Sequence, residues 1–467
     1  MSDRWPVWLA GTAAVVSIVA ALIVVQENAP PTVAMAPESA DPTPSVVPLP
    51  PEVKWSRSAE EVYGRKFAQF RDPGAGNQGY SSAAAFIDAG DVYITAIGLP
   101  DPSNGNFDAP AIVGLDASDG STVWRRDDVR VDACADRLLL GSLICVSGVD
   151  SVELDSTIVL IDATTGEGRS IRTPQHVLAV GTDGASVYTV NSTVTPQGYE
   201  GTPQLRKGSV DDLDRDWISE FPGVAIYAAS RGTAITVDGT YGLGRFGSTA
   251  IGFDSVTGVI TWYRGYPDRC VQQPYRIQPA LVIMTEAVCS QSESFTGTAA
   301  VASNGRIVAR SPTPIYPYPE IDAPADLSLP MIVGDTAFER TTGAFAWSSP
   351  LLASTNGVAV VGDVVIVRAP GTAHVTALDL RTGSVRWEDD PGDYYPITAS
   401  IDGLAYFSVG GVVQSIALND GSTRRRTEIE PTPDPYASNR HLGSRVTQSG
   451  DRLVYSSTAT LAVLDRR

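Results

Sequence analysis

Short apolar runs, separated by turns that contain Gly, Pro or Asp, recur along most of the chain. The segments AGDVYITAIG, which begins at Ala89, and NGVAVVGDVVIVRAPG, which begins at Asn356, are typical of the pattern. Runs of this length, rich in Val and Ile and bounded by turn residues, predict β-strands. Beyond Gly74 no helical period occurs. The pattern therefore predicts an all-β protein with many short strands, and the counts of 43 Gly and 33 Pro agree with many turns.

One hairpin pattern recurs along the chain at a spacing of roughly 43 residues, which indicates a repeat architecture. Weaker copies lie near Val210, Ser303, Arg340 and Leu418. A second pair of strands precedes each hairpin, and a unit of four strands is one blade of a β-propeller. The clearest copies are IVGLDASDGSTVW from Ile112, IVLIDATTGEGRSI from Ile158, AIGFDSVTGVITW from Ala250 and VTALDLRTGSVRW from Val375.

Each copy combines an Asp, a Gly and often a Trp, and each residue type has a structural role. The Asp accepts hydrogen bonds from amides two or three residues further on, and the Gly supplies the positive φ that closes the hairpin. The Trp is a large, rigid side chain that can pack between adjacent units. The predicted structural residues are Asp116, Gly120, Trp124, Asp162, Gly166, Asp254, Gly258, Trp262, Trp347, Asp379, Gly383 and Trp387.

The motif strand–Asp–x–x–Thr–Gly–x–x–x–Trp resembles the pyrroloquinoline-quinone-type (tryptophan-docking) repeat. Quinoprotein dehydrogenases contain this repeat, and so does the non-catalytic lipoprotein that assists the insertion of outer-membrane barrels in bacteria. The resemblance extends from about Ser81 to Arg467 and implies a single β-propeller of four-stranded blades. The family usually has eight blades, and the chain supports seven to nine. We favour eight, because the copy around Arg340 is short and residues 315–329 resemble an insertion.

The last blade is expected to be completed by a strand from the other end of the chain. The sequence ends at LAVLDRR, directly after a predicted third strand. We expect the missing outer strand within residues 53–70. In the same region, Ser58 and Glu61 have the spacing of a capping box that opens a short helix, with Val62, Tyr63, Phe67 and Phe70 on one side.

The N-terminal region predicts a membrane anchor and a linker. Residues 5–26 contain no charged side chain and are long enough to cross a hydrocarbon core of roughly 30 Å. Arg4 precedes this stretch, which predicts a cytoplasmic N-terminus and an extracytoplasmic propeller. The alternative is a cleaved signal peptide, but the apolar stretch is too long and Pro37 follows the one Ala-x-Ala site. The predicted parts are an anchor (residues 1–27), a Pro-rich extended linker (residues 28–57) and the propeller (residues 58–467).

Charge and cysteine content narrow the function classes. The formal net charge of −19 repels phosphate backbones and excludes nucleic-acid binding. Cys134 and Cys145 flank one predicted hairpin, and Cys270 and Cys289 bracket a longer one. All four follow the anchor, so we expect two local disulfides, Cys134–Cys145 and Cys270–Cys289, in an oxidising compartment. The alternatives are a cysteine nucleophile and a metal site. Both are disfavoured, because no His lies near these cysteines in the sequence and the chain contains no Cys-x-x-Cys motif.

No catalytic, cofactor or metal residue can be assigned from the sequence. The family resemblance implies an adjacent Cys-Cys pair and a calcium set of Glu, Asn and Asp in an active quinoprotein dehydrogenase, and the chain has no Cys-Cys dipeptide. The run from Asp211 to Asp216 is the best metal candidate, but it lacks the Gly and the terminal Glu of a calcium loop. A solvated turn is the favoured interpretation of this run.

Four links that follow predicted fourth strands differ from the plain Asp turns. They are YRGYPDRC, SPTPIYPYPEID, EDDPGDYYPIT and EIEPTPDPYASN, and each combines Pro, Tyr and an acidic residue. Pro stiffens a loop and Tyr offers a large contact area at low entropic cost, although both also fill ordinary propeller loops. We expect an acidic partner-binding surface anchored by Tyr316, Tyr318, Tyr394, Tyr395 and Tyr436.

These observations predict a membrane-tethered extracytoplasmic propeller that is a non-enzymatic protein-interaction or envelope-assembly scaffold. The expected partner is a protein of the cell envelope, and no cofactor is expected. The alternative is a dehydrogenase, or another redox protein, that depends on pyrroloquinoline quinone.

Overall fold

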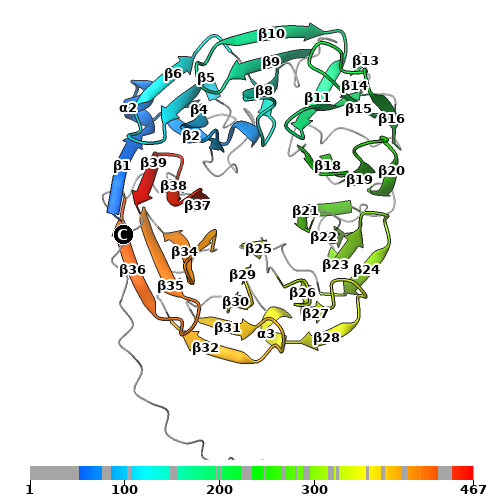
Figure 1. Cartoon of the computed structure of the whole chain (residues 1–467), viewed down its shortest axis with the longest axis vertical. Helices are drawn as coiled ribbons and strands as arrows, with labels where there is room; N and C mark the ends of the chain where they lie inside the picture. The colour runs from blue at the N-terminus through cyan, green and yellow to red at the C-terminus, as the bar shows by residue number, and fades with distance from the viewer. Residues whose placement is uncertain are drawn as a thin grey trace, which may run out of the picture. The chain divides into compact units, whose positions relative to one another are not determined.

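The computed structural model describes most of the chain after residue 51. The described residues are 52–75, 86–101, 107–129, 131–147, 156–192, 194–195, 198–199, 202–221, 234–246, 249–265, 270–278, 281–287, 295–313, 320–321, 326–353, 357–369, 374–390, 397–409, 411–429 and 444–465. Residues 48–467 form one compact unit. Among the described residues of this unit, nine antiparallel sheets follow one another in chain order as the blades of one propeller (Figure 1).

The first five blades each contain four strands, paired in the order in which they occur along the chain. Blade 1 contains β2 (Gln69–Arg71), β4 (Val92–Pro100), β5 (Phe107–Asp116) and β6 (Thr122–Arg126), and blade 2 contains β7 (Ala133–Cys134), β8 (Ser142–Ser147), β9 (Ser156–Asp162) and β10 (Gly168–Thr173). Blade 3 contains β11 (His176–Thr182), β12 (Val187–Ser192), β15 (Gln204–Gly208) and β16 (Trp217–Glu220), and blade 4 contains β17 (Ala234–Asp238), β18 (Tyr241–Phe246), β19 (Thr249–Asp254) and β20 (Ile260–Arg264). Blade 5 contains β21 (Cys270–Gln278), β22 (Leu281–Ala287), β23 (Phe295–Ala302) and β24 (Ile307–Ser311).

Blades 6 to 9 complete the ring. Blade 6 contains β26 (Met331–Val333), β27 (Thr336–Phe338) and β28 (Phe345–Ser348), and blade 7 contains β29 (Gly357–Val361), β30 (Val364–Arg368), β31 (Val375–Asp379) and β32 (Val385–Asp389). Blade 8 contains β33 (Ala399–Ile401), β34 (Leu404–Val409), β35 (Val412–Ala417) and β36 (Thr423–Glu428). Blade 9 contains β37 (Arg445–Ser449), β38 (Arg452–Ser456), β39 (Thr460–Asp465) and β1 (Glu52–Ser58).

A few short elements lie outside this regular scheme. Strand β3 (Ile87–Asp88) pairs with β4, β13 (Val194–Thr195) pairs with β14 (Gly198–Tyr199), and β25 (Glu320–Ile321) runs parallel to β29. The helices of the described residues are α2 (Ala59–Tyr63), the 3₁₀ turn η1 (Pro73–Ala75) and α3 (Pro350–Ala353).

The favoured number of eight blades is wrong, because the short copy around Arg340 is a blade of its own. Its strands β26, β27 and β28 pair in sequence, and β26 and β27 have only three residues each. The propeller therefore has nine blades, of which blade 6 has three strands among the described residues.

The predicted closing strand from the N-terminal side is confirmed. Strand β1 pairs antiparallel with β39, with Glu52 opposite Asp465 and Ser58 opposite Thr460. It lies at the outer edge of blade 9 (Figure 1). The strand begins within the predicted linker, so residues 52–57 belong to the sheet.

The predicted capping box is also present, but its helix is shorter than expected. The Ser58 hydroxyl accepts a hydrogen bond from the Glu61 amide, and the Glu61 carboxylate accepts one from the Ser58 amide. Gly64, with a φ of 80°, ends helix α2 after five residues. Phe67 therefore does not continue a helical face and is 67% exposed, while Phe70 is buried in β2.

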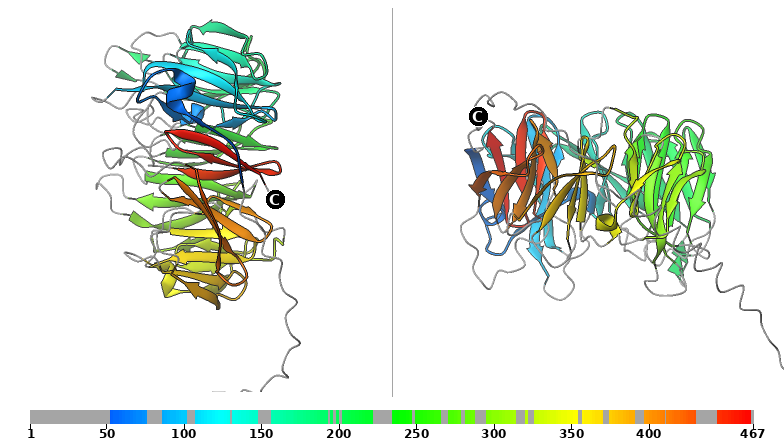
Figure 2. Two further views of the ribbon diagram at one scale, coloured as in Figure 1. Left: turned by 90° about the vertical axis from the view of Figure 1, so that its left-hand side faces the viewer. Right: turned by 90° about the horizontal axis from the view of Figure 1, so that it is seen from below.

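The core of the propeller lies between neighbouring blades, and we call each such interface a seam. Nine clusters of buried apolar side chains occur among the described residues, one for each seam, including the seam between blades 9 and 1. Inner strands such as β22 and β30 are buried along most of their length, whereas β10 and β32 expose most of their residues. Figure 2 shows the twisted sheets side by side around the ring.

Within the described ranges, no helix has the length and apolarity needed to cross a membrane. The predicted anchor, residues 5–26, lies outside those ranges.

Candidate functional site

Tryptophan side chains dock across six of the nine seams in the described part of the chain. Trp124 shows the arrangement: it lies on β6 of blade 1, and its indole Nε1 donates a 2.9 Å hydrogen bond to the carbonyl of Ala163 in blade 2. The ring packs on Gly166, where a Cβ atom would lie 2.6 Å from the indole. The docked residues are Trp55, Trp124, Trp217, Trp262, Trp347 and Trp387, resting on Gly120, Gly166, Gly258, Gly305, Gly383 and Gly421.

The four tryptophans named from the sequence are all buried, at 5–8% exposure. Trp55 and Trp217 also dock between blades, and neither was predicted from the sequence. Trp55 lies on the closing strand and donates to the carbonyl of Ala117 in blade 1, and Trp217 donates to that of Ser255 in blade 4. A signal for Trp217 was present, because it directly follows the degenerate turn of blade 3.

The aspartates of the repeat close the turns that receive these tryptophans. Asp162 accepts hydrogen bonds from the Thr164 and Thr165 amides and from the Thr165 hydroxyl. The Thr165 amide and then its hydroxyl hold the pKa of the Asp162 carboxyl below its usual value. The pKa of Asp254 is lowered in the same way by the amide and hydroxyl of Thr257. These carboxylates stabilise turns and are directed at their own backbone.

One of the two predicted disulfides is confirmed. Cys134 and Cys145 face each other on β7 and β8 and are bonded. The Cys270–Cys289 prediction lies outside the described residues, because Cys289 is not among them. The predicted anchors Tyr316, Tyr318, Tyr394, Tyr395 and Tyr436 also lie outside the described residues.

The acidic run from Asp211 to Asp216 forms the turn between β15 and β16. Asp211 pairs with Arg169 at 2.9 Å, Asp214 with Arg206, and Asp216 with Arg215 at 2.8 Å. Across the described ranges, no group of three or more His, Cys, Asp or Glu side chains is placed to hold a metal ion.

The seam between blades 2 and 3 is built differently from the tryptophan-docked seams. In blade 1, Trp124 lies opposite Gly114, and a β-bulge interrupts the register between β5 and β6. In blade 2, β9 and β10 pair without a bulge, and Arg169 lies opposite Leu160. Arg169 thus takes the strand position that the tryptophan occupies in blade 1. Across the seam, the turn of residues 209–216 contains no glycine.

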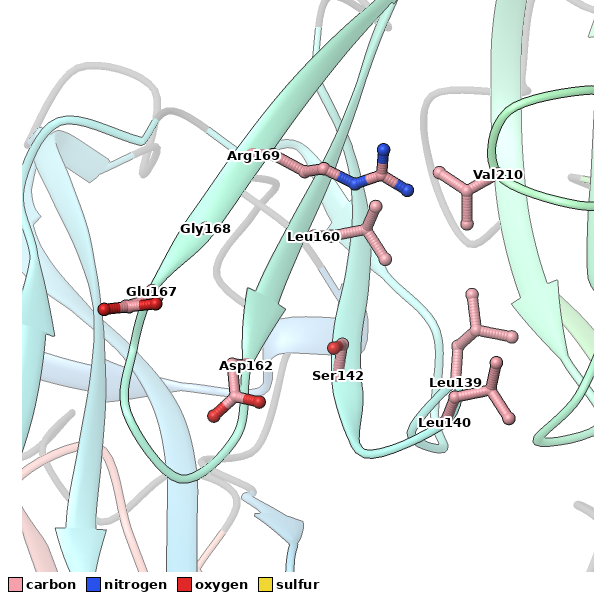
Figure 3. Close-up of a pocket in the computed structure, with 9 residues that line it drawn as sticks. All are labelled: Leu139, Leu140, Ser142, Leu160, Asp162, Glu167, Gly168, Arg169 and Val210. Atoms are coloured by element: carbon pink, nitrogen blue, oxygen red, sulfur yellow. The ribbon is translucent and has the colours of Figure 1, made fainter.

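This seam contains an open cavity of about 450 Å³. Leu139, Leu140 and Leu160 of blade 2 form its apolar wall, and Val210 of blade 3 lies across from them. Figure 3 shows the side chains of Leu160 and Arg169 directed toward the space that Leu139, Leu140 and Val210 border. Leu140 is 81% exposed and has a φ of 48°. Its amide donates to the Gly184 carbonyl of blade 3, which fixes this wall against the neighbouring blade.

Acidic groups surround the cavity. The turn of blade 2 contributes Asp162 and Glu167, and the turn of blade 3 contributes four aspartates. Residues 162–169 and 209–216 contain six carboxylates and two arginines, and Arg206 of β15 pairs with one of the aspartates, so three of the six carboxylates are in ion pairs. The site therefore combines an apolar wall, one half-exposed guanidinium and an excess of negative charge.

The C-terminal part of the chain is similar to a known protein family. Residues 335–467 match the family model described as outer membrane protein assembly factor BamB. No curated protein matches the chain. Among solved structures, BamB from Moraxella catarrhalis is 17% identical, with a TM-score of 0.39 over 72% of this chain and 94% of that one. A quinohemoprotein alcohol dehydrogenase from Comamonas testosteroni is 9% identical, with a TM-score of 0.42 over 87% and 77%.

The family match begins at β27 and covers every later strand to β39, so it includes blades 7 and 8, most of blade 6 and the three C-terminal strands of blade 9. Residues 335–467 are therefore similar to the BamB family, and the nine-bladed fold agrees with the repeat pattern along the chain.

Proposed function

We propose that this protein is a non-enzymatic scaffold that binds other proteins in a bacterial cell envelope. The observation that carries the proposal is the match of residues 335–467 to the family of the outer membrane protein assembly factor BamB. The repeat chemistry supports it: the Asp side chains of the turns bond to their own backbone, and the tryptophans are used in packing between blades. The proposed location is outside the cytoplasm, with residues 5–26 as the membrane anchor.

The partner can be tested by crosslinking in cells. A photoreactive amino acid placed at exposed positions of the full chain should capture one or a few envelope proteins reproducibly, as mass spectrometry would show. Positions on the exposed outer strands, such as Val123 and Val385, provide matched reference sites. Capture that is equally diffuse at every position would contradict a scaffold role.

The anchor and the absence of catalysis need separate tests. Deletion of residues 5–26 should release the protein from the membrane fraction, while the intact chain should resist an alkaline wash. Purified protein mixed with pyrroloquinoline quinone and Ca²⁺ should show neither the cofactor spectrum nor dye-linked alcohol oxidation. Either signal would replace the scaffold proposal by the dehydrogenase alternative.

The tyrosine-rich links remain our proposed main partner surface. Replacing Tyr394 and Tyr395 together by Ala should reduce capture of the crosslinked partner without lowering the melting temperature. Unchanged capture, or loss of folding in place of binding, would count against these two anchors.

A further inference from the structure

The seam between blades 2 and 3 lacks the docked tryptophan of the six seams described above, and the cavity there lies where an aromatic ring would pack. At those seams, an indole from one blade packs on a glycine turn of the next. At the seam 2/3, the tryptophan is replaced by Arg169 and the receiving turn has no glycine. The volume left open is about 450 Å³, which lies within the usual range of ligand pockets.

The walls of the cavity suit a flat aromatic group. Leu140 and Leu160 supply apolar contacts on one side and Val210 on the other. The Arg169 side chain is 58% exposed, so its guanidinium can lie over an aromatic face while it remains beside Asp211. Aromatic side chains are also the residues that most often anchor protein interfaces.

The negative charge around the cavity favours basic residues beside the aromatic group of a ligand. Glu167 forms no ion pair with another described residue, and the Asp212 carboxylate accepts a hydrogen bond from the nearby Asp214 amide. Both carboxylates are exposed and lie on the two turns that border the cavity. A lysine or arginine next to the aromatic residue would therefore meet negative charge on either side.

We propose that this cavity binds an aromatic side chain, flanked by basic residues, from an extended segment of a partner protein. The inference rests on the proposed scaffold function and specifies the chemistry of one partner contact. It is independent of the tyrosine-rich links, which belong to other blades.

The probe for the test is the peptide Lys-Trp-Lys, with blocked ends and a 5-fluorotryptophan, titrated with the full chain in lipid nanodiscs and followed by ¹⁹F NMR. The wild-type protein should shift or broaden the fluorine signal in a saturable way. Leu140→Asn should weaken binding by about tenfold, because it removes an exposed apolar wall. Asn is compatible with the positive φ of this position, so the fold should be kept.

Val256→Asn is the matched control. Val256 is 62% exposed in the turn between β19 and β20 of blade 4, which corresponds to the turn of residues 209–216 in blade 3 but receives Trp217. This variant should bind the probe like the wild type. Val210→Asn, on the opposite wall, should repeat the loss seen with Leu140→Asn and guards against a local folding defect.

Three further peptides and one further variant test the specificity. Replacing both lysines by Gln should weaken binding, and so should Glu167→Gln with the original probe. Replacing the fluorotryptophan by 4-fluorophenylalanine should retain binding, whereas an aliphatic trifluoroleucine probe should bind much more weakly. No saturable shift, equal binding to Leu140→Asn and Val256→Asn, or equal binding of the aliphatic probe would overturn the inference.

The result is separable from the test of the scaffold function. If crosslinking captures a partner equally well in wild type and Leu140→Asn, the scaffold function stands and this site is wrong. If no partner is captured while the peptide binds specifically to the cavity, the site stands and the scaffold function is wrong.

Discussion

The seams on either side of blade 2 solve the same packing problem in different ways. At the seam 1/2, Trp124 lies between Gly114 of its own blade and Gly166 of the next, and its indole hydrogen bond crosses the interface. At the seam 2/3, an exposed ion pair of Arg169 and Asp211 spans the interface beside an open cavity. A buried indole contributes both area and a satisfied donor, whereas exposed ion pairs contribute little. The first seam is therefore built for stability, and the second leaves surface available for binding.

The largest effect should come from removing the tryptophan of the seam 1/2. Trp124→Ala should lower the free energy of unfolding by roughly 3–5 kcal/mol, the range for large-to-small changes in a core. Chemical denaturation followed by circular dichroism measures this. Trp387→Ala, at the seam 7/8, should behave in the same way. A melting curve like that of the parent would show that tryptophan docking does not hold the blades together.

The disulfide of blade 2 should have the next largest effect. Both cysteines belong to the core cluster of the seam 1/2, and they are 11 residues apart. Replacing both by Ala should cost about 2–3 kcal/mol, because the unfolded chain regains the conformational entropy that the bridge removes. Non-reducing peptide mapping should show the Cys134–Cys145 link in the wild type. If a reductant destabilises the double variant as much as it destabilises the wild type, a different disulfide is responsible for the effect.

A single methyl group should test how tightly the docking surface fits. Gly166 has a φ of +72°, and a Cβ there would lie 2.6 Å from Trp124. Gly166→Ala should cost about 1–3 kcal/mol through strain and overpacking. In a double-mutant cycle with Trp124→Ala, the steric part should disappear. Strict additivity of the two changes would mean that the ring and the turn do not press on each other.

The smallest effect is expected at the seam 2/3. Arg169→Ala should change the free energy of unfolding by less than about 1 kcal/mol, because the pair with Asp211 is exposed and screened by salt. Thermal melts at low and high ionic strength should differ little between this variant and the wild type. A loss comparable to that of Trp124→Ala would erase the distinction between the two seams.

Most of the blade architecture could be predicted from the sequence, because the residues that define each turn lie close together in the chain. The Asp, the Gly and the Trp of a turn lie within nine residues of one another, and the strands between turns are short and apolar. The closing strand was also predictable, since the last copy of the repeat lacks its outer strand. Blade 6 was not counted as a blade because its strands β26 and β27 are only three residues long and because residues 315–329, which precede it, resemble an insertion.

The cavity was only partly predictable. The copy that begins at Ile158 ends without a Trp, which is a visible exception. However, the absence of a β-bulge, the position of Arg169 opposite Leu160 and the approach of Val210 depend on the pairing of strands and the contact between blades. A repeat pattern fixes which residues belong to a turn, but it does not report the space that remains between two turns from different blades.

The pairing of β1 with β39 has a consequence for the order in which the molecule can fold. Ser58 and Thr460 are neighbours in blade 9, yet roughly 400 residues separate them along the chain. During synthesis, β1 emerges early and has no partner until the last strand has been made. Contacts between such distant segments carry a high loop-closure cost and form slowly. Until then β1 exposes an unpaired strand edge, and such edges are prone to pair with other chains. Ring closure is therefore expected to be a late, rate-limiting step, and the nascent chain is most exposed to aggregation while its first strand waits for its last.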